Sequence, residues 1–572
     1  MAEGGRAARL GLALGLVALS ACGGRPQGAG DSAAGGEGPP ITAGRARSAA
    51  EVEGLRFTDP ELEQMLQPAS LFRGLPGRRE EYRAVRDQRP GNGTPPALLF
   101  TPWPPAHEPA DRAPRWGPAP RIRRPDDLEQ LAYAPLPVLS ELVRTRRVTS
   151  VELTRMFLDR LRRYDSLVHA VVTLTTDTAM AQARRADREI AAGRWRGPLH
   201  GIPYGLKDLF DYPGYPTTWG AAPYRERRVD SMATVARRLE DAGAVLVAKT
   251  TLGALAWGDV WFGGQTRNPW NLEQGSSGSS AGSAATVSAG LVPFAIGTET
   301  LGSVLSPSAR TGITGLRPSF GRVSRHGGMV VSWSMDKVGV LCHHAEDCAM
   351  VFDAMRGPDG RDPTVVDRPF PYRPRTDLSG ARIGYVKAAF EADTGADGRT
   401  DRAVLDVLRS LGATLVPIEL PDRSVSSLEY ILAAEAAAAH DTLTRTDLDS
   451  LLVRQQAAAW PNVFRTARLV PATEYIQANQ VRRLLGRDMR DLMEDLDAYV
   501  VPPGLSSNLL LTNLTGQPAM AVPDGFSDPD APRSVTFVGP MYGEAGLLEI
   551  VGAYQAATEW DDAHPERFTP HP

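Results

Sequence analysis

Residues 278–283 read GSSAGS, residues 284–296 read AATVSAGLVPFAI, and residues 297–303 read GTETLGS. Two serine clusters therefore flank a run that is too apolar to be a linker. Glycine lets the backbone approach a ligand closely. Serines beside such glycines can offer a hydroxyl and a backbone N–H to the same reacting atom. Acyl transfer needs this combination: a nucleophile, and donors aimed at the developing oxyanion.

A candidate base lies upstream, in the stretch GIPYGLKD at residues 201–208. Lys207 follows an apolar run punctuated by glycine and proline, which predicts a strand end or a tight turn, not a solvated helix. Burial lowers the pKa of a lysine because the charged form loses hydration. A neutral lysine can then accept a proton as a general base.

These motifs resemble those of the amidase signature family, which are serine hydrolases with a Ser–cis-Ser–Lys triad. The family's lysine motif matches at Lys207, its first serine motif at residues 277–283, and its second at residues 298–303. The resemblance makes Ser279 the cis-serine and Ser303 the nucleophile, and their spacing is similar to the family's. It runs from about residue 136 to the C-terminus, and three motifs in the right order make it specific.

The resemblance implies an α/β fold with a large mixed β-sheet covered by helices on both faces. It also implies a mechanism. Neutral Lys207 would accept the proton of Ser279, Ser279 would take that of Ser303, and Ser303 would attack the carbonyl of a small-molecule carboxamide or ester. Water would then hydrolyse the acyl-enzyme. No metal or organic cofactor is required.

The oxyanion hole implied by the resemblance uses the backbone N–H groups of Thr300, Leu301, Gly302 and Ser303. Three glycines of the family's motifs are replaced, at positions 277, 281 and 301. Leu301 keeps the N–H that is needed there if its φ stays negative. The arginine that usually follows the nucleophile is replaced by Leu305, which favours uncharged carboxamides as substrates.

Length and composition are those of a globular enzyme. The 572 residues can bury a large core in one or two domains, and 42% hydrophobic and 23% charged residues are ordinary values. A net charge of −4 with no long basic patch indicates no nucleic-acid partner. Nothing indicates the oligomeric state.

Cys342 and Cys348 lie in the stretch CHHAEDC. This spacing lacks the two cysteine pairs of a tetrahedral zinc site, so we interpret it as a turn entering a helix at residues 349–355. In an oxidising compartment the two cysteines could instead form a disulfide, and the sequence alone does not decide this.

The amino terminus resembles a bacterial lipoprotein signal. Arg6 and Arg9 precede an apolar run at residues 10–19, and LSAC follows at residues 19–22. The run is too short for a transmembrane span and has signal-peptide proportions. We expect cleavage after residues 1–21, a lipid on Cys22, and export to the bacterial cell envelope with membrane anchoring. A secretory signal without lipidation is the alternative.

The remaining organisation follows from composition and periodicity. Residues 22–50 predict a flexible tether, residues 51–130 an N-terminal extension packed on the enzyme, and residues 131–572 the catalytic domain. Thr149 and Glu152 form a capping box ahead of an amphipathic helix. We also expect a helix at residues 232–240, a strand at 244–248, and a turn at Asp397–Gly398.

Three other functions compete with the amidase prediction. Residues 278–282 match the nucleophile elbow of an α/β-hydrolase esterase, with Ser280 as nucleophile, but the preceding residues are polar where an apolar strand is required. Leu301 and Leu305 leave open a lipoprotein that binds an amide or a peptide without hydrolysing it. A component of a tRNA-dependent amidotransferase would share the core motifs, but the export signal argues against a role in translation.

Overall fold

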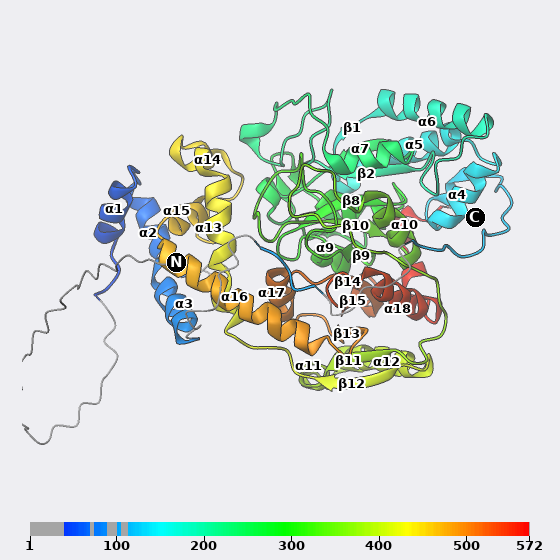
Figure 1. The fold of residues 1–572 in the computed structure, drawn as a ribbon. Coiled ribbons are helices and arrows are strands. Elements are labelled where there is room, and N and C mark those ends of the chain that lie inside the picture. Colours follow the sequence, from blue (N-terminus) through cyan, green and yellow to red (C-terminus); the bar gives the residue numbers. More distant parts are fainter. Residues whose placement is uncertain (1–38, 69–73, 89–99, 105–112, 571–572) are drawn as a thin grey trace, which may run out of the picture.

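The computed structural model describes residues 39–68, 74–88, 100–104 and 113–570 (Figure 1). The predicted signal peptide and Cys22 lie outside these residues. Eleven strands form one mixed sheet in the order β1–β3–β2–β8–β10–β9–β14–β15–β13–β11–β12. In that order they are Val171–Leu174, Val245–Thr250, Pro203–Lys207, Ala295–Glu299, Lys337–Cys342, Thr314–Arg317, Ala519–Asp528, Ala531–Val538, Ala498–Val501, Arg382–Val386 and Thr414–Ile418.

Helices cover both faces of this sheet, as the expected fold requires. Alternate residues of a strand point to opposite faces. In β3, Leu246 lies in one hydrophobic cluster while Val245 and Val247 lie in another, so both faces are packed. The helices around the sheet are α4 Leu136–Arg144, α5 Ser150–Val168, α6 Thr176–Ala191, α7 Thr234–Asp241, α8 Ala281–Ser288, α9 Leu305–Thr311, α10 Ala345–Met355, α11 Lys387–Ala392, α12 Ala396–Ser410 and α18 Glu544–Ala556.

Neighbouring parallel strands position the candidate site. β2 pairs with β8 in parallel, with Gly205 opposite Ala295 and Leu206 opposite Ile296. Their carboxyl ends therefore lie at the same edge of the sheet. This pairing brings Lys207, the last residue of β2, beside the second serine cluster, which begins in β8.

Local predictions for the amino half of the catalytic domain are confirmed. Thr149 and Glu152 form a reciprocal capping box at the start of α5. The predicted helix at residues 232–240 is α7 and the predicted strand at 244–248 is β3. The predicted turn at Asp397–Gly398 is wrong, because both residues lie in the first turn of α12. Gly398 is needed there for close approach, since a Cβ would collide with the carbonyl of Asp393.

A helical arm joins the sheet domain on one side (Figure 1). It contains α13 Tyr430–Ala439, α14 Asp441–Arg445, α15 Trp460–Ala467, α16 Ala472–Leu492 and α17 Ser506–Thr515. Within the N-terminal extension, α2 Asp59–Leu66 and α3 Leu75–Asp87 pack on this arm. Arg465 of α15 donates to Glu61 at 2.9 Å, and the rings of Tyr82 and Tyr430 meet edge to face at 5.3 Å. Farther along the extension, the N–H of Arg115 donates to the Tyr372 carbonyl at 2.8 Å.

The tether predicted for residues 22–50 is wrong at its carboxyl end. Residues Ala43–Val52 form helix α1, which packs against α2, with Ala46 and Ala50 buried. Thr42 caps this helix by accepting a hydrogen bond from the N–H of Arg45. Alanine has the highest helix propensity, so an Ala-rich segment beside a packing surface becomes helical although its composition is typical of linkers.

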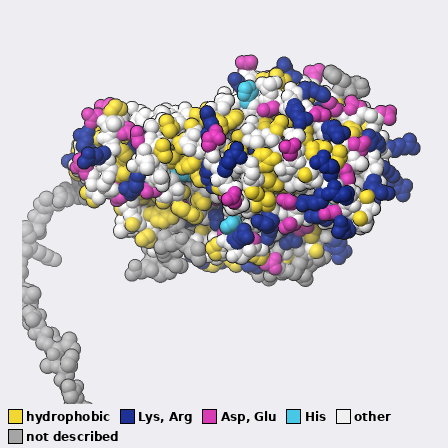
Figure 2. All heavy atoms as spheres, turned by 90° about the horizontal axis from the view of Figure 1, so that it is seen from above, with side chains coloured by type: hydrophobic (Ala, Val, Ile, Leu, Met, Phe, Trp, Pro, Cys, Tyr) yellow, Lys and Arg dark blue, Asp and Glu magenta, His cyan; other side chains and the backbone are white. Residues whose placement is uncertain are grey.

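Arg162 and Arg163 of α5 lie on a solvated surface, whereas Arg160 of the same helix is buried and donates to the carbonyls of Gly290 and Phe568. Arg162 pairs with Asp159, and Arg163 with Glu129, each at 2.8 Å. Figure 2 shows Lys and Arg side chains interspersed with Asp and Glu over the face seen from above. Within the described ranges, no helix combines the length and the apolar character that crossing a bilayer requires.

Candidate active site

Lys207 is fully buried at the end of β2. Its Nζ lies 2.8 Å from Ser279 Oγ, 3.0 Å from Ser280 Oγ, and 3.0 Å from Thr298 Oγ1. Nζ also donates to the Thr298 carbonyl at 3.3 Å. Burial holds the pKa of Lys207 well below its ordinary value, although the charges of two acidic residues oppose this. The amine is therefore poised to be neutral, and it faces serine hydroxyls.

The loop that carries Ser279 has a constrained backbone. The Gly278–Ser279 peptide bond is cis, as the family resemblance implies. Gly278 lies so close to the Gly258 carbonyl that a Cβ would not fit. Ser277 has φ 62°, a region that glycine prefers, and its N–H donates to Asp259 Oδ2 at 3.2 Å. That hydrogen bond helps to hold a non-glycine residue in the family's glycine position.

The backbone joins the two serine clusters. The N–H of Ser280 donates to the carbonyl of Ser303 at 3.0 Å. Ser279 and Ser303 are both buried, and within the described residues neither hydroxyl bonds to the other. Thus Lys207 and Ser279 are in direct contact, whereas Ser303 is brought to the site through its backbone.

The second cluster presents a row of free backbone donors. In the described part of the chain, the N–H groups of Thr300, Leu301, Gly302 and Ser303 have no hydrogen-bond partner. Gly302 has φ 87°, and a side chain there would meet Ser306. Leu301 does not have a positive φ, and its side chain packs against the main core. Leu301 therefore has an ordinary backbone conformation, which does not prevent its N–H from acting as a donor.

Glu299 holds the backbone that directly follows this cluster. Its carboxylate accepts from the N–H groups of Val304 and Leu305 at 2.9 and 3.0 Å, and from Arg317 at 2.7 Å. Burial alone would raise the pKa of Glu299, but Arg317 and these hydrogen bonds lower it to about 2. Asn513 of α17 also donates to it at 2.9 Å. Leu305 is buried and contributes only its N–H.

Asp336 and Glu435 are two residues near the site that the motifs do not reveal. Asp336 accepts from Thr300 Oγ1 at 2.6 Å and from the N–H of Ser332. Glu435 of α13 accepts from Ser332 Oγ at 2.6 Å and from Ser334. Burial raises the pKa of Asp336. A chain of hydrogen bonds thus runs from the helical arm to the free donors, and no sequence spacing signals it.

The elbow interpretation of Ser280 does not fit. Ser280 is fully buried, and its hydroxyl is held by Lys207 and donates to the Thr298 carbonyl at 3.2 Å. The strand before it, β7 Asn271–Gly275, pairs with β6 Arg267–Asn268 and not with the main sheet. A second short hairpin pairs β4 Val260–Trp261 with β5 Gly264–Gln265. Ser280 is therefore not an exposed nucleophile at the end of a central strand, as the elbow would require.

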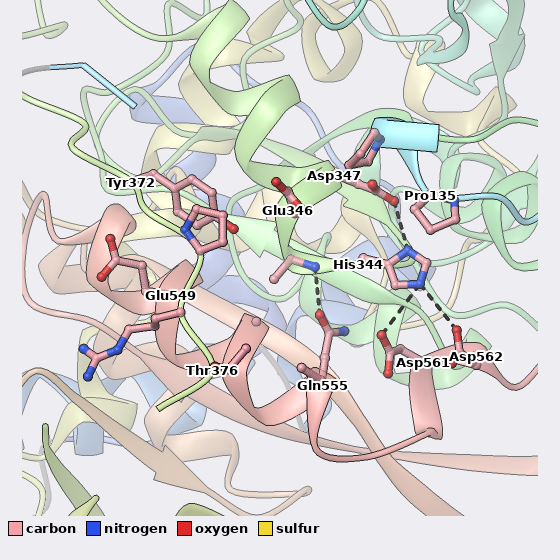
Figure 3. A pocket seen from close by; sticks show the side chains of 16 residues that line it. Pro135, His344, Glu346, Asp347, Tyr372, Thr376, Glu549, Gln555, Asp561 and Asp562 are labelled. Atoms are coloured by element: carbon pink, nitrogen blue, oxygen red, sulfur yellow. Dashed lines mark hydrogen bonds and ion pairs between the residues drawn. The ribbon is translucent and has the colours of Figure 1, made fainter. Parts of the chain in front are cut away.

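The cysteine–histidine stretch is structural. Cys342 and Cys348 form a disulfide between β10 and α10. His344 lies in a cavity of about 350 Å³, with Nδ1 3.2 Å from Asp347 and Nε2 close to Asp561 and Asp562 (Figure 3). Burial would lower the pKa of His344, but the carboxylates raise it to about 10. No cluster of metal-ligating side chains occurs among the residues the structure describes.

Known proteins match both the sequence and the fold. Residues 152–507 match the Amidase family. The chain is 35% identical over 472 residues to a component of the glutamyl-tRNA(Gln) amidotransferase of Methylococcus capsulatus, covering 73% of this chain and 96% of that protein. The corresponding protein of Halorhodospira halophila is 34% identical over 75% of this chain and 98% of its own.

Solved structures agree. The peptide amidase of Stenotrophomonas maltophilia superposes with a TM-score of 0.67 and 30% identity, covering 75% of this chain and 98% of that one. The 6-aminohexanoate cyclic dimer hydrolase, at 23% identity and a TM-score of 0.65, shares the fold. The chain therefore belongs to the amidase signature family of hydrolases that act on amide bonds.

Proposed function

We propose that this protein hydrolyses a carboxamide through an acyl-enzyme on Ser303, with Lys207 and Ser279 as the proton relay. The observation that carries the proposal is the contact of a fully buried lysine, 2.8 Å from Ser279 Oγ, with its pKa well below the ordinary value. Such an amine can accept a proton from a serine hydroxyl at neutral pH.

The hydrogen bonds around Lys207 suit a neutral amine. Two of its N–H groups are used on the Thr298 carbonyl and on Ser280 Oγ, whose own proton goes to the same carbonyl. Of the two remaining contacts, Thr298 Oγ1 at 3.0 Å and Ser279 Oγ at 2.8 Å, we assign the lone pair to the shorter one, the hydroxyl of Ser279. This arrangement leaves Ser279 as the hydroxyl that gives up its proton.

The proposed reaction balances without a cofactor. Ser279 gives its proton to Lys207 and takes the proton of Ser303 as Ser303 Oγ bonds to the carbonyl carbon. The C–N bond breaks, and the leaving nitrogen receives a proton through Ser279. Water then attacks the ester, and the same relay removes its proton. The C–O bond to Ser303 breaks, and the relay returns that proton to Ser303 Oγ. The free N–H groups of residues 300–303 would stabilise both oxyanions.

We further propose that the enzyme acts alone and outside the cytoplasm, in contrast to the tRNA-dependent amidotransferase components to which it is similar. The signal pattern that ends at Cys22 supports export with a lipid anchor. The Cys342–Cys348 disulfide supports the same location, because disulfides persist mainly in oxidising compartments. The substrate would then be an exported or environmental small-molecule amide.

A fluorophosphonate probe tests the nucleophile. The full-length protein in detergent should be labelled, and Ser303→Ala should not be. Ser527→Ala, an exposed serine of β14, is the matched control and should be labelled normally. Mass spectrometry of the labelled peptide should place the adduct on Ser303.

Three outcomes would contradict the proposal. Labelling that survives in Ser303→Ala but is lost in Ser280→Ala would support an esterase that uses Ser280. Absence of labelling, together with no turnover of an amide and ester panel, would support a binding protein. Fractionation that places the protein in the cytosol without a lipid on Cys22 would remove the export proposal alone.

A further inference from the structure

A cavity of about 340 Å³ opens beside the candidate site. Its wall includes Thr298, which contacts Lys207, and Thr300, whose N–H has no partner among the described residues. Leu209 and Phe210, which closely follow β2, form another part of the wall. The cavity therefore adjoins the proposed site through Thr298 and Thr300, while Lys207, Ser279 and Ser303 themselves are not part of its wall. Its volume is in the range of small-ligand pockets.

The wall is mainly apolar. Its larger apolar members come from the residues that follow β2, from the segment that leads into β10, and from β10 itself. They are Phe210, Met329, Val330, Val331, Trp333 and Val338. Trp333 is 50% exposed, which is unusual for a tryptophan and adds apolar surface to the cavity.

The buried charges in the wall already have partners within the protein, and Arg361, which also lines the cavity, is exposed to solvent. Asp336 accepts hydrogen bonds from Thr300 and from two backbone N–H groups. Asp362 forms an ion pair with Arg325 at 2.8 Å, and Lys337 donates to the Met335 carbonyl. A charged ligand group would lose hydration here without gaining a buried partner.

His326 supplies one polar anchor. It lines the cavity, and neither ring nitrogen has a hydrogen-bond partner among the described residues. Nδ1 is shielded from solvent, so Nε2 is the nitrogen that a ligand could reach. A neutral imidazole nitrogen either donates or accepts one hydrogen bond. A ligand with a single polar atom at the right position would satisfy it.

We propose that this cavity binds an apolar, uncharged substituent that the substrate carries next to the scissile amide, about the size of a leucine or phenylalanine side chain, with a polar atom directed to His326. The inference rests on the proposed function, because the cavity receives part of the substrate only if the N–H of Thr300, in its wall, faces the reacting carbonyl. It narrows the substrate class to amides with hydrophobic aliphatic or aromatic substituents.

The test compares kcat/KM across a series of amides: acetamide, phenylacetamide, N-benzylacetamide, 4-hydroxyphenylacetamide and the charged succinamate. One of the aromatic amides should exceed acetamide about tenfold or more, since hydrophobic pockets discriminate by this order. Succinamate should fall below acetamide. In Val330→Asp and Trp333→Ala, the ratio of aromatic amide to acetamide should drop about tenfold.

Two controls complete the design. Trp560→Ala removes another exposed tryptophan, outside the cavity, and should leave the ratio unchanged. His326→Phe should remove any advantage of 4-hydroxyphenylacetamide over phenylacetamide.

A flat series in a protein that the fluorophosphonate labels, or a ratio unaffected by Val330→Asp, would overturn the cavity assignment alone. Absence of both labelling and turnover would overturn the proposed function, and this inference with it.

Discussion

Replacing Lys207 with methionine removes the amine and keeps a side chain of similar length. A positioned general base contributes about 10²–10⁴-fold to rate. We therefore expect kcat/KM to fall by about that factor, which corresponds to about 2.7–5.4 kcal/mol in the activation barrier. Lys387→Met, at an exposed lysine of α11, should have no effect.

Stability should change much less than activity. The substitution removes four hydrogen-bond contacts of Nζ. A hydrogen bond typically contributes about 1 kcal/mol to the free energy of unfolding. It also removes the cost of burying an amine whose pKa is depressed in the folded state. These effects oppose each other, so we expect the free energy of unfolding to change by about 2 kcal/mol or less.

The pH dependence of stability gives a separate check. Because the folded-state pKa of Lys207 lies below the unfolded one, the unfolded chain binds more protons between the two values. The cost to stability is absent above the unfolded pKa and grows as the pH falls towards the folded pKa. Lys207→Met should remove this contribution.

The assay combines turnover and fluorophosphonate labelling with a thermal unfolding curve followed by circular dichroism. Wild-type turnover should fall on the acid side as Lys207 is protonated. A folded Lys207→Met protein that keeps more than a tenth of wild-type kcat/KM would refute the assignment of the base.

Three further predictions follow from neighbouring contacts. Asp336→Asn should move the acid limb of the pH–rate profile to lower pH, because the negative charge of Asp336 raises the pKa of Lys207; an unmoved limb would contradict this. Glu435→Gln should lower kcat between about tenfold and about a hundredfold with KM nearly unchanged, as misplacement of the Thr300 donor would; Tyr475→Phe, which removes one donor to Glu435, should cost less. Replacing Cys342 and Cys348 by serine should lower the free energy of unfolding by about 2 kcal/mol, measured by urea denaturation, since the closed loop is short.

Much of the catalytic core can be predicted from the sequence, because the patterns that indicate it are local. The capping box at Thr149, the strand that ends at Lys207, and the glycine-rich serine clusters each depend on a few adjacent residues. The parallel pairing of β2 with β8 then brings these segments together. Periodicity alone does not reveal that pairing, and here the family resemblance supplies it.

Other parts of the structure depend on contacts between distant segments, which no local pattern reveals. Asp336 and Glu435 are separated by about a hundred residues and are linked through Ser332, whose N–H donates to Asp336 and whose Oγ donates to Glu435. The composition around Gly398 is typical of a turn, whereas the glycine serves close packing against the Asp393 carbonyl. The composition of residues 43–50 is typical of a tether. It does not reveal that α2 provides a surface on which these residues pack as a helix.

The docking of α2 on α15 also has a consequence for biosynthesis. Glu61 and Arg465 are 404 residues apart in the chain, so the amino-terminal helices acquire their partner only when most of the polypeptide has been made. Contacts of such long sequence separation form late, because a large loop must close first. If the chain crosses a membrane with its amino end first, α2 would therefore lack its partner α15 until most of the polypeptide had crossed.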